Sequence, residues 1–244
     1  MNTSESKLRK VSLGRASRRR LLRWRAGGPR AAWARWLQLL AGLFVYGVSN
    51  ALMIRSGLGL GPWDAFHVGL HRLTGMSVGV ASIVVGLAIV AGTTFMKERP
   101  GPGTLANMVL VGVFLDLVLV VLPEAGGWAV GLAFFTAGVA LCGLATGLYI
   151  AAGLGKGPRD GLMISLSERT GWPVRRVRTL IEVAVLALGW LMGGTVGVGT
   201  VLFTLTIGPV TQWGLQLFCM TATGGAKSVR PRDAGDESAL REAA

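Results

Sequence analysis

The chain has 244 residues, of which 51% are hydrophobic and only 15% are charged, whereas a typical soluble domain carries about 25% charged residues. The formal net charge is +13, and residues 1–35 hold 11 of the 25 Lys and Arg residues. This composition argues against a soluble protein. It also argues against a nucleic-acid-binding domain, because the basic residues are concentrated in one tail and are not spread over a fold.

The first element is therefore a basic tail over residues 1–35, which we expect to be disordered and cytoplasmic. Lys and Arg next to a first membrane helix are typical of a cytoplasmic anchor. Each basic residue near an anionic lipid surface contributes about 1 kcal/mol of attraction, so anionic lipid headgroups are an expected partner. A second tail, over residues 224–244, is expected to be disordered and cytoplasmic as well.

Six long apolar segments follow, and they predict six crossings of a lipid bilayer. A helix rises about 1.5 Å per residue, so about 20 residues span a core of about 30 Å. Because backbone groups in lipid must be paired within the segment, the crossings are expected to be helices. The sequence thus predicts an all-α membrane domain over residues 36–223, with crossings at 36–55, 77–96, 104–122, 129–151, 177–194 and 200–222.

The distribution of positive charge predicts the orientation of these crossings. With the amino terminus in the cytoplasm, the inside segments hold 23 Lys and Arg residues, and the outside segments hold only Arg55 and Arg72. Since positive residues accumulate on the cytoplasmic side, both termini are expected to be cytoplasmic.

An internal repeat with an offset of 96 residues is the most informative feature. The block GLGLGPWD at 57–64 recurs as GLGKGPRD at 153–160, and nine of the 19 positions in 57–75 are identical at this offset. The repeats, 37–122 and 133–218, each contain three predicted crossings. An odd number of crossings predicts that the second copy is inverted, which is a common plan for secondary transporters.

These paired blocks and the six-crossing layout resemble the YczE/YyaS/YitT group of bacterial membrane proteins over about residues 36–222. The resemblance implies a multi-pass protein of the bacterial plasma membrane. The group has no settled biochemical activity, so the resemblance brings no functional residues with it.

Each Gly-Pro-x-Asp block predicts the start of a short helix. Proline suits the first helical turn, and an acidic residue there complements the positive end of the helix dipole. A helix over 63–73 is too short to cross a bilayer. It is either an amphipathic connector at the interface or a re-entrant element that meets its counterpart near the midplane. The candidate substrate-binding residues in the two blocks are Gly59, Gly61, Pro62, Asp64, Gly155, Gly157, Pro158 and Asp160.

Asp116 completes the set of candidate substrate-binding residues, because a charge in the middle of an apolar helix is costly and needs a reason. The alternative is an interhelical hydrogen bond that fixes packing. Arg178 and Glu182 are spaced to form a local ion pair. His67 and His71 lie four residues apart, but their repeat partners are Met163 and Ser167, so we do not predict a metal site.

The leading functional hypothesis is a transporter or permease for a small solute that binds between the repeats. The alternative is a non-transporting accessory or regulatory protein that binds a partner system. No catalytic set or nucleotide-binding loop is present in the sequence, so we predict neither an enzyme nor a bound cofactor. Glycines such as Gly42 and Gly138 are suited to close helix packing, either within the chain or in a homo-oligomer.

Overall fold

The computed structural model describes residues 29–96, 100–155 and 157–222, and within these ranges the chain is all helical. The two halves have the same order of elements, in which a short helix follows the first long helix. The helices are α2 (Pro29–Ser56), α3 (Pro62–Thr74), α4 (Val78–Phe95), α5 (Pro102–Val121), α6 (Trp128–Ala151), α7 (Pro158–Thr170), α8 (Val174–Leu191) and α9 (Val198–Ala222).

Most helix ends lie within three residues of the predicted ones, but the first helix does not begin at residue 36. α2 begins at Pro29, so residues 29–35 are helical and the expectation of a disordered tail is wrong for them. Arg35 shows one reason, because its side chain donates to the carbonyls of Ala152 (2.9 Å) and Gly153 (3.1 Å) at the end of α6. Residues 1–28 and 224–244 lie outside the described ranges.

Four of the described helices are long and apolar enough to cross a membrane, namely the Ala32–Ser56 part of α2, together with α4, α5 and α6. The other two long helices are more polar. α8 carries three arginines and Glu182 in its first half, and α9 has threonines, Gln212 and an internal Pro209 among its apolar residues. Length and composition alone therefore support four of the six predicted crossings.

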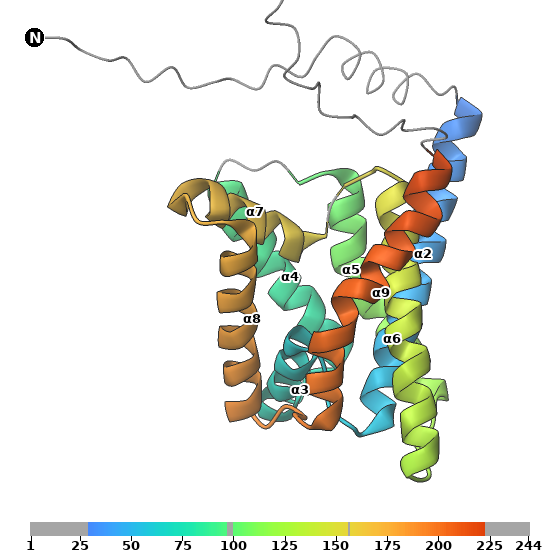
Figure 1. Ribbon diagram of the computed structural model, residues 1–244, viewed down its shortest axis with the longest axis vertical. Coiled ribbons are helices and arrows are strands. Elements are labelled where there is room, and N and C mark those ends of the chain that lie inside the picture. Colours follow the sequence, from blue (N-terminus) through green and yellow to red (C-terminus); the bar gives the residue numbers. More distant parts are fainter. Residues whose placement is uncertain (1–28, 97–99, 156, 223–244) are drawn as a thin grey trace, which may run out of the picture.

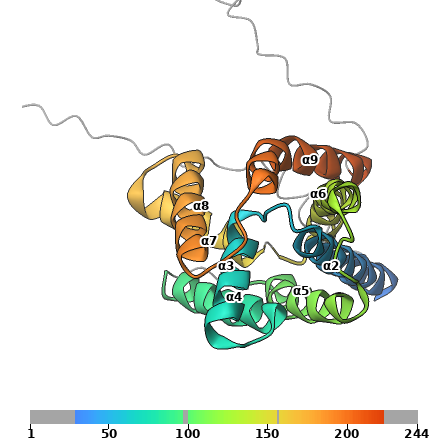
Figure 2. The same ribbon diagram turned by 90° about the horizontal axis from the view of Figure 1, so that it is seen from below.

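The six long helices run alternately up and down the long axis of the molecule, and α3 and α7 lie at opposite ends of it (Figure 1). α2 packs against α5 and α6, and α6 packs against α9. The short helices cross between the halves, because α3 packs against α8 and α7 packs against α4. Viewed along the bundle, α3 lies inside a ring of longer helices (Figure 2).

Glycines allow the closest helix contacts in this bundle. A Cβ atom built on Gly147 of α6 would lie 2.1 Å from the carbonyl oxygen of Gly214 on α9, and one built on Gly214 would lie 1.9 Å from that of Gly143. Real Cβ atoms do not approach backbone so closely. The α6–α9 seam therefore depends on small residues, as is typical of helix pairs in membranes.

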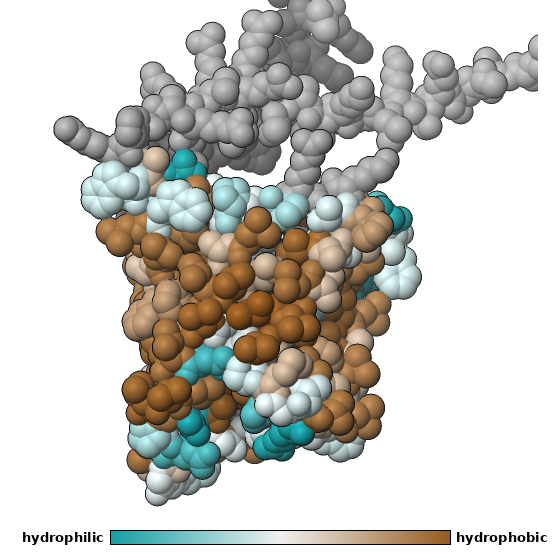
Figure 3. Space-filling model, turned by 180° about the vertical axis from the view of Figure 1, so that it is seen from behind, coloured by the Kyte–Doolittle hydropathy of each residue, from teal (hydrophilic) through white to brown (hydrophobic). Residues whose placement is uncertain are grey.

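The outer surface of the bundle is a broad apolar belt between two polar rims (Figure 3). Large apolar side chains are exposed on most of the long helices, for example Leu117 at 60% and Leu205 at 69%. A water-soluble monomer rarely exposes apolar patches of more than a few hundred Å². This surface is suited to a hydrocarbon environment.

Candidate functional site

Two glycine-rich loops, at residues 57–61 and 153–157, occupy equivalent places in the two halves. Each loop is hydrogen-bonded to the first turn of a helix from the other half, the first loop to α9 and the second to α5. The Leu58 carbonyl accepts a hydrogen bond from the Gly199 amide (2.8 Å), and the Leu154 carbonyl accepts one from the Gly103 amide (2.9 Å). The two hydrogen bonds are equivalent in the repeat, because Leu154 is the counterpart of Leu58 and Gly199 is the counterpart of Gly103. Gly59 has φ +122°, and a Cβ atom there would lie 2.7 Å from the Gly197 amide nitrogen. Glycine is therefore required by both backbone conformation and space.

A cavity of about 160 Å³ lies where the two halves meet, and every described helix contributes to its wall. Six of the nine predicted site residues line it: Gly61, Pro62, Asp64, Gly157, Pro158 and Asp160. The first turns of α3 and α7 thus both face one cavity. Their C-terminal turns, which end at the αL glycines Gly75 and Gly171, lie at opposite ends of the bundle (Figure 1).

Asp64 is held inside the bundle by polar partners. Only 5% of the residue is exposed, and its Oδ1 accepts a hydrogen bond of 3.4 Å from the Asn50 side-chain amide. The His67 Nδ1 lies 3.8 Å from the same oxygen. With the first turn of α3 and most of its inner face buried, this helix is an interior element of the fold.

Arg159 and Trp63 form the most distinctive pair in the cavity. The guanidinium carbon of Arg159 lies 5.0 Å from the centre of the Trp63 ring, which is cation–π geometry. Trp63 is 8% exposed, and its buried Nε1 has no hydrogen-bond acceptor. Among the described residues, we find no hydrogen bond or ion pair for Arg159 either. The two side chains come from equivalent positions of the repeats, one from each short helix.

Three predicted residues lie outside the cavity. Gly59 and Gly155 belong to the loops described above, where a Cβ atom on Gly155 would lie 2.8 Å from the Thr104 amide nitrogen. Asp116 lies at the α4–α5 seam. It accepts hydrogen bonds from the Ser77 hydroxyl (2.5 Å) and the Gly79 amide (2.8 Å), which is the interhelical contact that the sequence left as the alternative.

The histidines do not form a joint site. His67 is 1% exposed and lines the cavity, whereas His71 is exposed and pairs with the Met76 carbonyl. No group of three potential metal-ligating side chains is found in the described ranges. The predicted ion pair between Arg178 and Glu182 is confirmed, with a nitrogen–oxygen distance of 2.9 Å, and both residues line the cavity.

Sequence reasoning missed most of the polar wall of the cavity. Trp63 and Arg159 occupy the variable position of the Gly-Pro-x-Asp blocks. The repeat reveals only positions that are identical in both halves, so it does not mark these two residues. Tyr46, Asn107 and Tyr149 also line the cavity. They lie within long apolar stretches, and the sequence alone does not show whether such a side chain faces the lipid or the inside of the bundle.

An all-helical bundle with long apolar helices and an exposed apolar belt is the fold of an integral membrane protein. Residues 33–216 match the family of unknown function DUF6198, and the chain belongs to this family. It is 41% identical over 183 residues to the uncharacterized membrane protein YczE of Bacillus subtilis, covering 74% of this chain and 85% of YczE.

Two other relatives extend the comparison. An uncharacterized protein of Haemophilus influenzae is 35% identical over 199 residues, covering 78% of this chain and 91% of the relative. The uncharacterized protein YyaS of Bacillus subtilis is 27% identical over 165 residues, covering 66% of this chain and 82% of YyaS. No solved structure matches the chain.

Proposed function

We propose that this protein is a secondary transporter of the bacterial plasma membrane that binds a small solute in the central cavity. The observation that carries the proposal is the cavity itself, which is walled by the first turns of both short helices and by polar side chains from both halves. A solute site between two repeats, where short helices begin, is the arrangement on which alternating-access carriers are built. A packing scaffold has no need of such a space.

The proposal includes six crossings, two inverted halves and two cytoplasmic termini. The exchanged contacts support it, because α3 pairs with α8 just as α7 pairs with α4. The polar first half of α8 is compatible with a crossing because Arg178 and Glu182 neutralise each other and face the cavity. In this arrangement α3 and α7 are re-entrant helices that enter from opposite sides of the membrane.

The inverted topology predicts opposite accessibility of the two short-helix ends. Thr74 and Thr170 are equivalent, exposed residues in the last turns of α3 and α7. In a background with Cys219 replaced by serine, a membrane-impermeant maleimide should label Thr74→Cys in intact cells. It should label Thr170→Cys only after the membrane is opened. Labelling of both variants in intact cells would rule out the inverted arrangement.

Transport is tested by filling the cavity. Thr146 of α6 lines the cavity, whereas Thr136 of the same helix is exposed, and each hydroxyl donates to a carbonyl four residues earlier. Wild-type protein in liposomes should take up at least one radiolabelled solute from a panel of amino acids, carboxylates, sugars, amines, phosphate and lipid precursors. Uptake should be saturable, should be lost in Thr146→Trp, and should persist in Thr136→Trp.

Two results would contradict a transporter. One is the absence of saturable uptake of any solute by folded wild-type protein. The other is uptake that is equal in Thr146→Trp and wild type. Either result, together with a stable co-purifying membrane partner, would favour the accessory role.

A further inference from the structure

The two halves differ at one seam, between the third and second long helices of each repeat. In the first half, α4 and α5 are in direct contact at Gly79 and Gly112. A Cβ atom on Gly79 would lie 2.1 Å from the Gly112 carbonyl oxygen. In the second half the equivalent positions are Arg175 and Gly208. A Cβ atom on Gly208 would have nothing within 4 Å.

This difference leaves α8 and α9 apart. α4 packs along α5, but α8 has no comparable contact with α9, and both ribbon views show the two helices separated (Figures 1 and 2). Asp116, which joins α5 to the start of α4, has Gln212 as its repeat partner, and Ser77 has Pro173. The bonds that close the first seam therefore have no equivalent in the second.

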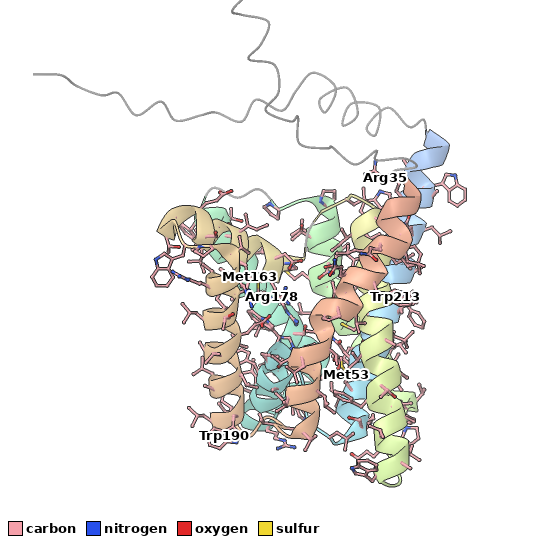
Figure 4. The ribbon with its side chains drawn as sticks, in the orientation of Figure 1. Arg35, Met53, Met163, Arg178, Trp190 and Trp213 are labelled. Atoms are coloured by element: carbon pink, nitrogen blue, oxygen red, sulfur yellow. The ribbon has the colours of Figure 1, made fainter. Side chains whose placement is uncertain are left out.

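The central cavity reaches this open seam. Arg178 and Glu182 on α8, and Phe203, Ile207 and Thr211 on α9, belong to its wall. The side chain of Arg178 extends from α8 toward α9 (Figure 4), and half of it is exposed. Large apolar side chains are exposed on both helices, for example Leu188 at 51% and Leu205 at 69%, so in a membrane both helices would face hydrocarbon chains.

The inner end of the cavity is suited to an anion. Trp63 Nε1 is a buried donor with no acceptor, and the Arg159 guanidinium lies over the Trp63 ring without a hydrogen bond to any described residue. Both lie near the first turns of α3 and α7, where backbone amides favour negative charge. The acidic residues of the cavity are already engaged, since Asp64 is bonded to Asn50, Glu182 is paired with Arg178 and Asp160 has its own contacts.

We propose that the ligand is a single-chain amphiphile with an anionic head, which enters between α8 and α9. Its head binds Arg159 and the Trp63 Nε1, and its apolar chain lies in the α8–α9 seam. The inference rests on the cavity of the proposed function and specifies the class of its substrate. The unsatisfied Trp63 N–H and the Arg159 guanidinium select the head group, and a seam between two helices with exposed apolar side chains selects the chain.

The test measures binding and not transport, so it can fail independently of the proposed function. The full chain in phosphatidylcholine nanodiscs is photolabelled with a long-chain fatty acid that carries a diazirine on its chain, and labelled peptides are identified by mass spectrometry. We expect saturable labelling of α8 and α9 that unlabelled laurate displaces and acetate does not. The alcohol of the same chain length should label these helices at least tenfold less, since it lacks the charge-assisted hydrogen bonds that a carboxylate accepts.

Variants locate the two parts of the ligand. Arg159→Gln should reduce labelling about tenfold, whereas Arg169→Gln, on the exposed last turn of α7, should not change it. Gly208→Leu should block the seam and abolish labelling. Gly92→Leu, which places the same side chain at another open helical glycine, should leave it intact, and thermal unfolding of each variant establishes that it is folded.

Four outcomes would overturn the inference. Equal labelling by the acid and the alcohol would show that the head-group site does not require a negative charge. Displacement by acetate as effective as by laurate would make the ligand a soluble anion. A crosslinked dimer joined through α8 and α9 would make the seam a contact between copies of the chain. Uptake of a polar solute without amphiphile binding would leave the transporter standing and refute only the substrate class.

Discussion

Replacing Gly214 by alanine is expected to destabilise the protein strongly. The new Cβ atom would lie 1.9 Å from the Gly143 carbonyl oxygen and 2.5 Å from its carbon, and a backbone contact of this kind cannot be relieved by a side-chain rotation. Overpacking costs about 1–3 kcal/mol, which corresponds to a fall in melting temperature of roughly 3–10 °C for a chain of this size. The shift can be measured by thermal unfolding of purified protein in a mild detergent.

Gly92→Ala is the matched control for this prediction. Gly92 lies in α4, and a Cβ atom there would meet nothing within 4 Å. Because alanine favours a helix by about 1 kcal/mol over glycine, this variant should be as stable as wild type or more stable. A Gly214→Ala protein that melts at the wild-type temperature would show that α6 and α9 are not packed at this distance.

The sequence predicted the long helices well because most of them are apolar and begin next to a glycine or proline. The short helices α3 and α7 were predictable from Pro62 and Pro158, which fit the first helical turn. The repeat also placed both blocks on one site, and the cavity does lie between their first turns. Hydrophobic periodicity is a local property of the sequence, so it predicts where the helices lie. The repeat adds the residues of the site that are the same in both halves.

The asymmetric features could not be predicted in this way. A repeat emphasises positions that are the same in both halves, whereas the unsatisfied donor Trp63 Nε1 and its cationic neighbour Arg159 stand at a position where the halves differ. The open seam at Gly208 was hidden for the opposite reason. Gly112 and Gly208 are identical in sequence, and only their neighbours, Gly79 in one half and Arg175 in the other, decide whether the helices touch.

Asp116→Ala is expected to have the second large effect, and the effect should be on stability. The variant loses the acceptor for the Ser77 hydroxyl and for the Gly79 amide at the start of α4. Hydrogen bonds to a charged group contribute about 1.5–3 kcal/mol, and an unpaired buried amide adds its own cost. A comparable loss in unfolding free energy is expected. Asp116→Asn, which keeps one acceptor oxygen, should lose less.

A double-mutant cycle with Ser77→Ala separates this role from a role in solute binding. If Asp116 acts by fixing the start of α4, the destabilisation of the double variant should be smaller than the sum of the two single effects, because the residues share a bond. Solute uptake per folded molecule should then equal that of wild type. If the Asp116→Asn protein is folded but has lost uptake, Asp116 belongs to the solute site and does not act through packing alone. In that case the solute would have to reach the α4–α5 seam, which the Gly79–Gly112 contact closes in this conformation.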